Sequence, residues 1–353
     1  MLLAIGSTAA GRPDWSRLLS APPDWFCSAE GQRATANILS FQAVHGDWPK
    51  NVDTVAAPFA GDRRTLRGTF DNGATVNEIR FLARAHAATG ETATADAVRR
   101  AVEHLLAAQY ANGGWPQSHP PGEGYSRHIT FNDGAMVNVM ELLREVDREP
   151  HFAFLGDEIR RRARSAFARG VECILRCQVR VNERLTVWAA QHDELTFEPR
   201  PARAFEPVAL SAGESAGILR LLMSLPEPSP DVRRSIAGAV AWYDAARLTG
   251  VRQVSRDGDK LIVRDSTAPP LWARFYEIGS NRPIFAGRDG VVRYRLADIE
   301  RERRVGYAWY GDWGAAVARD FARWRQTVGA ESAASPAQSE FSRSVNLQTS
   351  NHK

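Results

Sequence analysis

A short pattern recurs along the chain as FQAVHGDWPK at 41–50, as AQYANGGWPQ at 108–117 and, more loosely, as CQVRVNERLTVWAAQHD at 177–193. In each copy a helix is predicted to end before a loop that presents a tryptophan: Trp48, Trp115 or Trp188. A second series, which reads as helix starts, alternates with the first: FDNGATVNEI at 70–79, FNDGAMVNVM at 131–140 and LSAGESAGIL at 210–219. Two interleaved series of similar spacing predict a repeat of helical hairpins.

The repeat predicts a mainly α fold. Six segments place apolar residues at three- and four-residue steps among Ala, Leu, Arg and Glu: 76–89, 93–110, 135–146, 157–177, 214–224 and 231–247. About three hairpins that each bury one face against their neighbours would make an α/α toroid. The loops that follow one set of helices would then gather at a single end of the toroid.

The remaining segments suggest how the chain is divided. We expect an N-terminal extension at 1–35 and one main domain at 36–328, with the helical toroid at about 36–250. A smaller, irregular and partly β portion is expected at about 251–312, where alternating residues such as Leu261–Val263 indicate short strands. A final helix is predicted at about 313–325, and the Ser-, Ala- and Gln-rich end at 329–353 is predicted to be disordered.

The composition is that of a globular protein with an arginine-rich surface. The chain has 353 residues, of which 44% are hydrophobic, and its formal net charge is +4 because lysine occurs only at Lys50, Lys260 and Lys353 while arginine is abundant. No apolar stretch is long enough to span a membrane, and no signal peptide is visible. On charge alone, nucleic acid and an acidic polysaccharide are both candidate partners, since guanidinium groups suit phosphate and carboxylate alike. Arginine-rich codon usage would explain the same charge.

Acidic and amide side chains stand directly ahead of two predicted helices. TFDNGAT at 69–75 contains Asp71 and Asn72, and TFNDGAM at 130–136 contains Asn132 and Asp133. These residue types are also preferred helix N-caps, so capping is one interpretation. If the two helix starts meet at one end of the toroid, four oxygen-bearing side chains converge there and suit Ca²⁺. Two carboxylates in one place would equally suit the acid and base of a glycosidase.

Four loop arginines lie beside aromatic residues or prolines: Arg203 in PARAFEP, Arg274 in WARFYEI, Arg282 in NRPIF and Arg288 in GRDG. A solvated loop arginine is the simpler interpretation of each one taken alone. Several of them near an oxygen-rich cation site indicate instead a pocket for a polymer of carboxylates. The histidines show no HExxH spacing, and no glycine-rich phosphate-binding loop is present, so zinc and nucleotide chemistry are not supported.

Taken together, these motifs resemble family ten of the pectate lyases, and the resemblance spans roughly 40 to 320 in the same order. It rests on WPK at 48–50, TFDNGAT, NGGWPQ, TFNDGAM, PARAFEP, WARFYEIGSNRPIFAGRDGVVRY and GYAWYG at 306–311. The resemblance implies a mainly helical α/α toroid with a smaller partly β portion, in which 36–328 is the catalytic domain. It implies Ca²⁺-dependent β-elimination of polygalacturonate, or pectate, to unsaturated oligogalacturonates.

The resemblance also implies roles for particular residues. Asp133 would bind calcium, Asp71 and Asn72 would contribute to the same cation-and-substrate site, and Asp71 would lie closer to the bond that breaks. Arg203 would be the catalytic base, although an arginine can accept a proton only if its neighbours lower its pKa. Substrate binding is expected from a set of cationic residues: Arg274, Arg288, Arg282 and, as a weaker candidate, Lys50.

Three other functions compete with a lyase. A glycoside hydrolase on the same type of toroid would use Asp71 and Asp133 as acid and base. A cyclase or prenyl-transferring toroid shares the Gln–Gly–Trp runs, but no DDxxD or DxDD cluster is present. A non-catalytic binder of acidic glycans would keep the arginines and lack activity. We expect a monomer that binds neither nucleic acid nor membrane and that is secreted or periplasmic, the last inferred from function.

Overall fold

The computed structural model describes residues 13–334, and side chains as far as residue 327. The main helices are α3 (Ala29–Ser40), α4 (Val76–Thr89), α5 (Thr92–Ala107), α6 (Ala135–Arg148), α7 (Gly156–Cys177), α8 (Ala212–Met223), α9 (Pro230–Ala245) and α11 (Trp313–Ala334). Shorter helices are α1 (Trp15–Leu19), α2 (Pro23–Cys27) and α10 (Arg301–Gly306), and η2 (Asp71–Gly73) and η4 (Asn132–Gly134) are 3₁₀ turns. The predicted mainly α class is confirmed.

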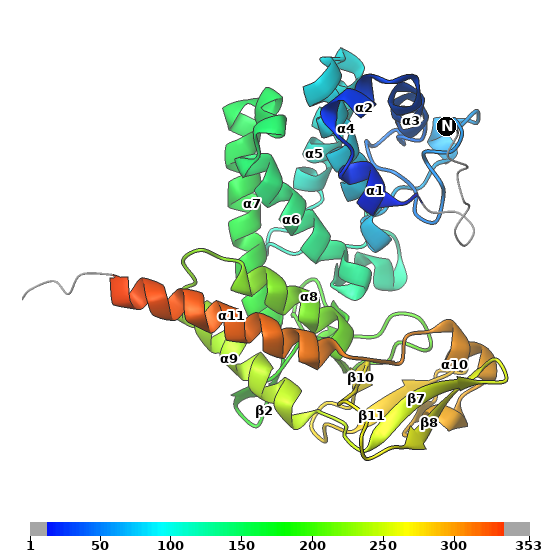
Figure 1. The fold of residues 1–353 in the computed structure, drawn as a ribbon, viewed down its shortest axis with the longest axis vertical. Helices are drawn as coiled ribbons and strands as arrows, with labels where there is room; N and C mark the ends of the chain where they lie inside the picture. The colour runs from blue at the N-terminus through cyan, green and yellow to red at the C-terminus, as the bar shows by residue number, and fades with distance from the viewer. Residues whose placement is uncertain (1–12, 335–353) are drawn as a thin grey trace, which may run out of the picture.

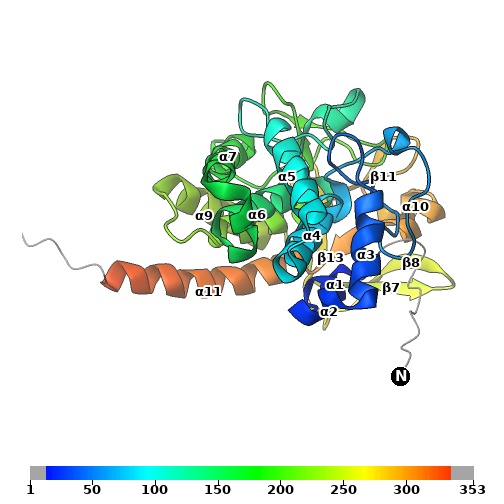
Figure 2. The same cartoon turned by 90° about the horizontal axis from the view of Figure 1, so that it is seen from above.

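The helices form the predicted hairpin repeat. Within the described residues, the hairpins α3–α4, α5–α6 and α7–α8 each enclose one of the three tryptophan loops. One layer consists of α3, α5, α7 and α9 in contact in that order, and the other consists of α4, α6, α8 and α11. Figure 2 shows the successive helices side by side from α3 to α9. In Figure 1 the helices up to α7 lie above α8, α9 and α11.

Each hairpin is held by the same buried hydrogen bonds. The indole Nε1 of Trp48, Trp115 and Trp188 donates to the carbonyl of Ile38, Leu105 and Ile174, respectively, over 2.7 to 2.8 Å. All three tryptophans have no exposed surface. A tryptophan needs a partner for this donor when it is buried, so each loop is tied to the preceding helix.

A glutamine six or ten residues before each tryptophan joins each hairpin to the next. Gln42, Gln109 and Gln178 each donate to a carbonyl within their own loop and to a carbonyl of the following helix in the same layer: Ala97 in α5, Ala166 in α7 and Ser235 in α9. The distances of these bonds are 2.7 to 3.0 Å. The amide therefore satisfies backbone acceptors that the loops would otherwise leave unpaired.

Helix ends follow the stop signals in the sequence. Gly90 ends α4 in the left-handed conformation at φ 72°, and its N–H donates to the carbonyl of His86. Gly113 has φ 93°, and a Cβ there would lie 2.2 Å from the carbonyl oxygen of Arg169. That approach of the Trp115 loop to α7 is open only to glycine.

Residues 15–35, expected to form an extension, are largely helical and pack on the domain. α1 and α2 contact α4, and Phe81 of α4 makes edge contacts with Trp15, Trp25 and Phe26. At the other end, α11 continues beyond the predicted end near 325 to Ala334. The rest of the segment predicted as a disordered tail, 335–353, and residues 1–12 lie outside the described residues.

The partly β portion begins earlier in the chain than predicted. Its four-stranded antiparallel sheet has the order β12 (Val292–Arg293), β11 (Pro283–Ala286), β10 (Phe275–Tyr276) and β6 (Leu210–Ser211), so it includes a strand that precedes α8. A separate hairpin pairs β7 (Val251–Arg256) with β8 (Asp259–Arg264) and contacts α10. β9 (Trp272–Ala273) pairs with β13 (Tyr310–Gly311).

The remaining strands are short and lie in the loop between α7 and α8 or beside it. They are β1 (Ile129–Thr130), β2 (Arg180–Val181), β3 (Arg184–Leu185), β4 (Gln191–His192) and β5 (Pro199–Arg200). β1, β4 and β5 form one sheet, and β2 and β3 form a hairpin. Among the described residues, no helix combines the length and apolar character that a bilayer crossing requires.

Candidate active site

The twin motifs lie against each other in the fold. η2 and η4 are in contact, and η4 also contacts α8, so the starts of α4, α6 and α8 gather at one place as the repeat predicts. Asn72 and Asp133 occupy equivalent positions with φ of 57° and 50°. Asn and Asp tolerate this left-handed conformation better than most residues.

Helix capping does not explain these side chains. The residues at the N-cap positions of α4 and α6 are Thr75 and Gly134, and neither helix has a side-chain capping bond. The acid and amide groups of both motifs are therefore free for other contacts. This removes the capping interpretation of the two motifs.

Asp71 is buried between two donors. Its Oδ2 accepts a hydrogen bond from Gln117 Nε2 at 2.8 Å and is paired with the ammonium group of Lys50. Its Oδ1 is buried and has no partner among the described residues. A buried carboxylate oxygen without a donor is costly, which favours a ligand at this position.

Arg274 joins the second motif to the start of α8. Its Nη2 donates to Asn132 Oδ1 at 3.2 Å and to Asp133 Oδ1 at 3.4 Å, and it is paired with Glu214. The Arg274 side chain is 10% exposed and its guanidinium carbon lies 4.6 Å from the centroid of the Tyr307 ring. A cavity of about 300 Å³ beside this cluster is lined by Asp133, Glu214 and Arg274.

Arg203 forms an ion pair with Glu206 that was not predicted from the sequence. Its Nε donates to Glu206 Oε2 at 2.7 Å, its Nη2 bonds the other carboxylate oxygen, and Glu206 is 2% exposed. Glu206 also accepts hydrogen bonds from Tyr307 Oη at 2.8 Å and Asn132 Nδ2 at 3.5 Å. The loop arginine is thus connected through Glu206 to the TFNDGAM motif.

A second arginine shares the Phe205 ring with Arg203. The guanidinium carbon of Arg203 lies 4.8 Å from the ring centroid and that of Arg303 lies 4.7 Å from it. Glu302 pairs with both Arg303 and Arg288, and the Arg288 bonds are 3.0 Å long. Arg288 is exposed, in a loop where a Cβ on Gly290 would lie 3.6 Å from the carbonyl oxygen of Ala204. Arg288 therefore stands on the rim beside the Arg203 loop.

The charges in this cluster shift each other's pKa values. Burial raises the pKa of Asp133, Arg274 acts against that shift, and the neighbouring carboxylates Asp71 and Glu214 add to it. The ion pair with Glu206 raises the pKa of Arg203 well above the usual range. Burial alone would raise the pKa of Glu206, but Arg203 and Tyr307 lower it overall. Arg203 is therefore firmly protonated in the ligand-free protein, which is the reverse of what the sequence argument required of a base.

The structure brings together most of the predicted site residues. Asp71, Asn132, Asp133, Lys50, Arg203 and Arg274 lie in one cluster with Arg288 at its rim, and Asn72 is exposed at η2 beside Asp71. Arg282 stands apart. It lies in the turn between β10 and β11, where it stacks on Tyr294 at 3.7 Å, whereas Arg274 is at the opposite end of the same hairpin.

Sequence reasoning missed four residues of this cluster: Glu206, Glu214, Arg303 and Tyr307. Glu214 had a signal, because it follows Gly213, the glycine of LSAGESAGIL that aligns with Gly73 and Gly134. Arg303 and Tyr307 approach the site only through the fold of the partly β portion. Tyr307 lies within the GYAWYG motif, but that motif did not single it out, and no quoted motif contains Arg303.

A separate acidic group does not belong to this cluster. The potential ligand atoms of His128, Asp193 and Glu194 lie within 4.8 Å of one another. However, Asp193 pairs with Arg200 and accepts two backbone N–H bonds, and Glu194 pairs with both Arg127 and His128. Both carboxylates already have cationic partners, so these residues are better explained as ion pairs that stabilise the β1–β4–β5 sheet.

The fold is a helical-hairpin scaffold that presents buried carboxylates and arginines at one end, and its family follows from comparison with known proteins. The profile of the family described as pectic acid lyase matches residues 42–318. The chain therefore belongs to the pectic acid lyase family and is a polysaccharide lyase. A comparison with curated proteins finds no match.

Solved structures agree with this family. A mutant of a family 10 polysaccharide lyase from Cellvibrio cellulosa, in complex with trigalacturonic acid, has 34% sequence identity and a TM-score of 0.75. That match covers 89% of this chain and 99% of the other. A family 10 polysaccharide lyase from the same organism also has 34% identity, with a TM-score of 0.74 and coverage of 87% and 96%.

Proposed function

We propose that this protein is a calcium-dependent pectate lyase that cleaves polygalacturonate by β-elimination to unsaturated oligogalacturonates. The observation that carries the proposal is the cluster in which Asp71 and Asp133 lie beside Arg274, with Arg203 close by. A structural relative at 34% identity was solved with trigalacturonic acid, which supports a substrate of the same class.

The acidic residues fit a calcium ion. Asp71 has an unpartnered buried oxygen, Asp133 is held at a raised pKa by burial and by nearby carboxylates, and Asn72 offers an amide oxygen at the surface. Hard oxygen ligands of this kind are the ones that Ca²⁺ takes in proteins. We assign Asp133, Asp71 and Asn72 to hold the ion. A bound cation would withdraw electrons from a galacturonate carboxylate and so make the neighbouring C5 proton more acidic.

Cationic side chains would bind the carboxylates of the polymer. Arg274 and Lys50 flank the acidic pair, and Arg288 extends the positive surface along the rim. Guanidinium groups form paired hydrogen bonds with carboxylates, so Arg274 and Arg288 would also set the orientation of the sugar acid. Arg282 is left out of this assignment because of its position at the far turn.

Arg203 is the proposed base. The base takes the C5 proton, the electrons of the C5–H bond form the C4–C5 double bond, and the C4–O bond breaks with its electrons on the glycosidic oxygen, which then gains a proton. In the ligand-free protein, Glu206 keeps Arg203 protonated. Arg203 would therefore react only at alkaline pH, or after the substrate loosens the pair with Glu206. We also assign Asp71, which pairs with Lys50, to the part of the site nearest the bond that breaks.

The first prediction concerns the reaction itself. The protein incubated with polygalacturonate should produce ultraviolet-absorbing unsaturated product, and Arg203→Ala should lower kcat by about 10³-fold or more, because proton abstraction loses its base. Arg282→Ala, which removes an exposed arginine outside the cluster, is the matched control and should retain activity. Products that have new reducing ends but no ultraviolet absorbance would show hydrolysis and would contradict the proposal.

The second prediction concerns the metal. Adding Ca²⁺ to the free protein should raise its thermal unfolding midpoint, because an ion that binds only the folded state stabilises it. Asp133→Asn should weaken that effect, with Ca²⁺ affinity reduced about tenfold or more, since one ligand charge is lost. Glu194→Gln, in the separate acidic group, should leave the calcium response unchanged. Equal responses of wild type and Asp133→Asn would contradict the assignment.

A galacturonate polymer lies outside the cell, so we also propose that the protein is secreted or periplasmic. We also propose that it acts as a monomer.

A further inference from the structure

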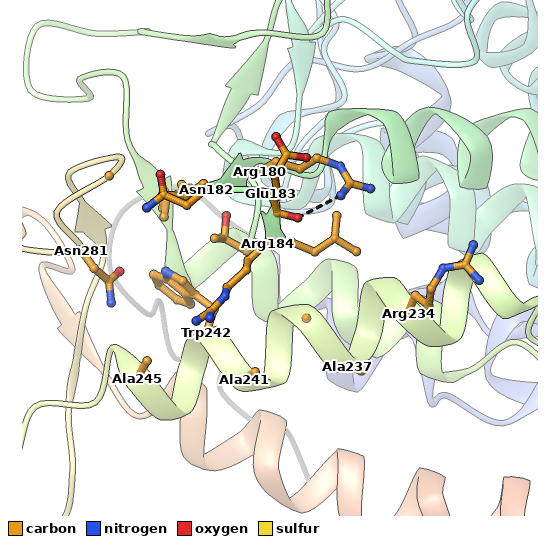
Figure 3. Close-up of a pocket in the computed structure, with 16 residues that line it drawn as sticks. Arg180, Asn182, Glu183, Arg184, Arg234, Ala237, Ala241, Trp242, Ala245 and Asn281 are labelled. Carbon is orange, nitrogen blue, oxygen red and sulfur yellow. Dashed lines mark hydrogen bonds between the residues drawn. The ribbon is translucent and has the colours of Figure 1, made fainter.

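A large cavity lies away from the candidate active site. It has a volume of about 1010 Å³ and lies between the β2–β3 hairpin, helix α9 and the turn that joins β10 to β11. None of the residues that line it belongs to the acidic and arginine cluster described above. Figure 3 shows the cavity with its lining side chains.

The cavity carries an excess of positive charge. Arg180, Arg184 and Arg234 line it, against a single carboxylate, Glu183. Arg234 is paired with Asp231, but among the described residues no carboxylate lies within ion-pair distance of Arg180 or Arg184. In Figure 3 the side chain of Arg184 extends toward Trp242. Arg180 Nη1 donates a hydrogen bond to the carbonyl of Glu183 at 3.4 Å, which leaves its charge unpaired. Two arginines without a carboxylate partner, on one wall of a cavity, favour an anionic occupant.

The floor of the cavity leaves room for a chain to lie along α9. Ala237, Ala241 and Ala245 are spaced one helical turn apart, line the cavity and are exposed. Their small side chains allow an occupant to approach the helix closely. A volume of this size is typical of sites that take a ligand of several rings.

Polar groups without partners stand at one end of this floor. Trp242 lines the cavity, is 6% exposed, and its indole Nε1 has no hydrogen-bond partner in the described part of the chain. Asn281, on the opposite wall, has an Oδ1 that also lacks a partner there. A buried donor and acceptor left unsatisfied are costly, so they indicate a site that is completed by a polar ligand. Figure 3 shows Asn281 and Trp242 near each other.

We propose that this cavity, which forms a groove along α9 and is called the groove below, is a second binding site for polygalacturonate, separate from the active site. The proposal rests on the proposed function, because the acidic polymer that the enzyme degrades is a polyanion. Such a polymer fits arginines that have no carboxylate partner, beside a helix with small exposed side chains. One polymer could then occupy both sites. The second contact would be intramolecular and would strengthen binding of long chains without affecting short ones.

Binding is tested by electrophoresis of the full-length protein in native gels that contain polygalacturonate. The tested variant is Arg180→Glu/Arg184→Glu, and Ala241→Trp blocks the floor without changing charge. The matched control, Arg256→Glu/Arg319→Glu, makes the same net-charge change at exposed arginines outside the groove. Each variant is also compared in an Arg274→Ala background, which weakens the active site. Gels with dextran, a neutral polymer, report retardation that does not depend on carboxylates.

The groove variants should bind polygalacturonate about tenfold more weakly than the control. They should cleave trigalacturonate with unchanged kcat/KM and show a raised KM for long polymer. Equal retardation of groove and control variants would overturn the proposal, as would equal retardation by dextran. A change in sedimentation coefficient in the groove variants would mean that the groove binds a second copy of the chain, which would also overturn it. Retained groove binding without lyase activity would reject only the proposed function.

Discussion

Arg203 and Glu206 are three residues apart and form the ion pair on which the proposed chemistry depends. Glu206 is buried, and its negative charge raises the pKa of the arginine above that of a free guanidinium. A base with a raised pKa is deprotonated only in a very small fraction near neutral pH. The rate of β-elimination should therefore rise with pH over the alkaline range.

Glu206→Gln tests this relation. The amide keeps the size of the side chain but removes the charge, so the pKa of Arg203 should fall and the alkaline rise of kcat/KM should move to lower pH by on the order of one unit. Glu277→Gln, which changes a half-buried carboxylate that accepts a hydrogen bond from Tyr294 outside the cluster, is the control and should leave the profile in place. A Glu206→Gln profile that overlays the wild type would show that Arg203 does not titrate in the rate-limiting step.

The helical elements depend on the repeated buried glutamine. Gln178 is 6% exposed and donates to the carbonyls of Thr186 and Ser235, so one amide joins the third tryptophan loop to α9. The same arrangement at Gln42 and Gln109 joins α3 to α5 and α5 to α7. These bonds set the spacing of one helical layer and, through the hairpins, the place where the helix starts of the other layer meet.

Gln178→Met should destabilise the protein. The thioether fills a similar volume but removes both hydrogen bonds of the amide and leaves the loop carbonyl of Thr186 without this donor, so the free energy of unfolding should fall by about 2–3 kcal/mol in urea denaturation. Gln326→Met, on the exposed face of α11, should stay within about 0.5 kcal/mol of the wild type. If both variants were equally stable, the glutamine bridge would contribute nothing beyond local packing.

At the scale of the whole molecule, the buried groups His192 and Glu78 change the free energy of unfolding in opposite directions as the pH changes. His192 accepts the N–H of Ala189 at Nε2 over 3.0 Å and is 2.8 Å from the carbonyl of Phe197 at Nδ1, and burial lowers its pKa to about 4. Burial raises the pKa of Glu78 to about 7. His192 therefore favours the folded state above pH ~6.5 and loses this effect as the pH falls to about 4, whereas Glu78 favours it below pH ~4.5 and loses it as the pH rises through about 7.

The two effects are similar in size, up to roughly 3 kcal/mol each, and cancel in the wild type between about pH 4.5 and 6.5. In His192→Gln the free energy of unfolding should therefore increase as the pH falls through this range, and in Glu78→Gln it should decrease. Urea denaturation at several pH values measures both slopes, and His45→Gln, at an exposed position, serves as the control. Parallel slopes in all three variants would contradict this account.

The sequence by itself determined the class of fold, because the spacing of apolar residues and the residues that end helices are local properties. The predicted helix at 76–89 matches α4, and the tryptophan loops and helix starts that alternate in the sequence are the loops and starts of the hairpins. It also predicted Asp71, Asp133, Arg203 and Arg274 as residues of one site, since repeat symmetry and the resemblance to a family both pointed to them.

Only the tertiary structure decided which of these charges touch. Glu206 comes from the loop before α8 and Glu214 from its first turn, whereas Tyr307 and Arg303 come from the partly β portion. Glu206 pairs locally with Arg203, but its contacts with Asn132 and Tyr307 join distant segments, as does the pair of Glu214 with Arg274. Arg203 is held protonated and Arg282 is held away because burial and strand pairing, which no local pattern contains, set the partner of each side chain.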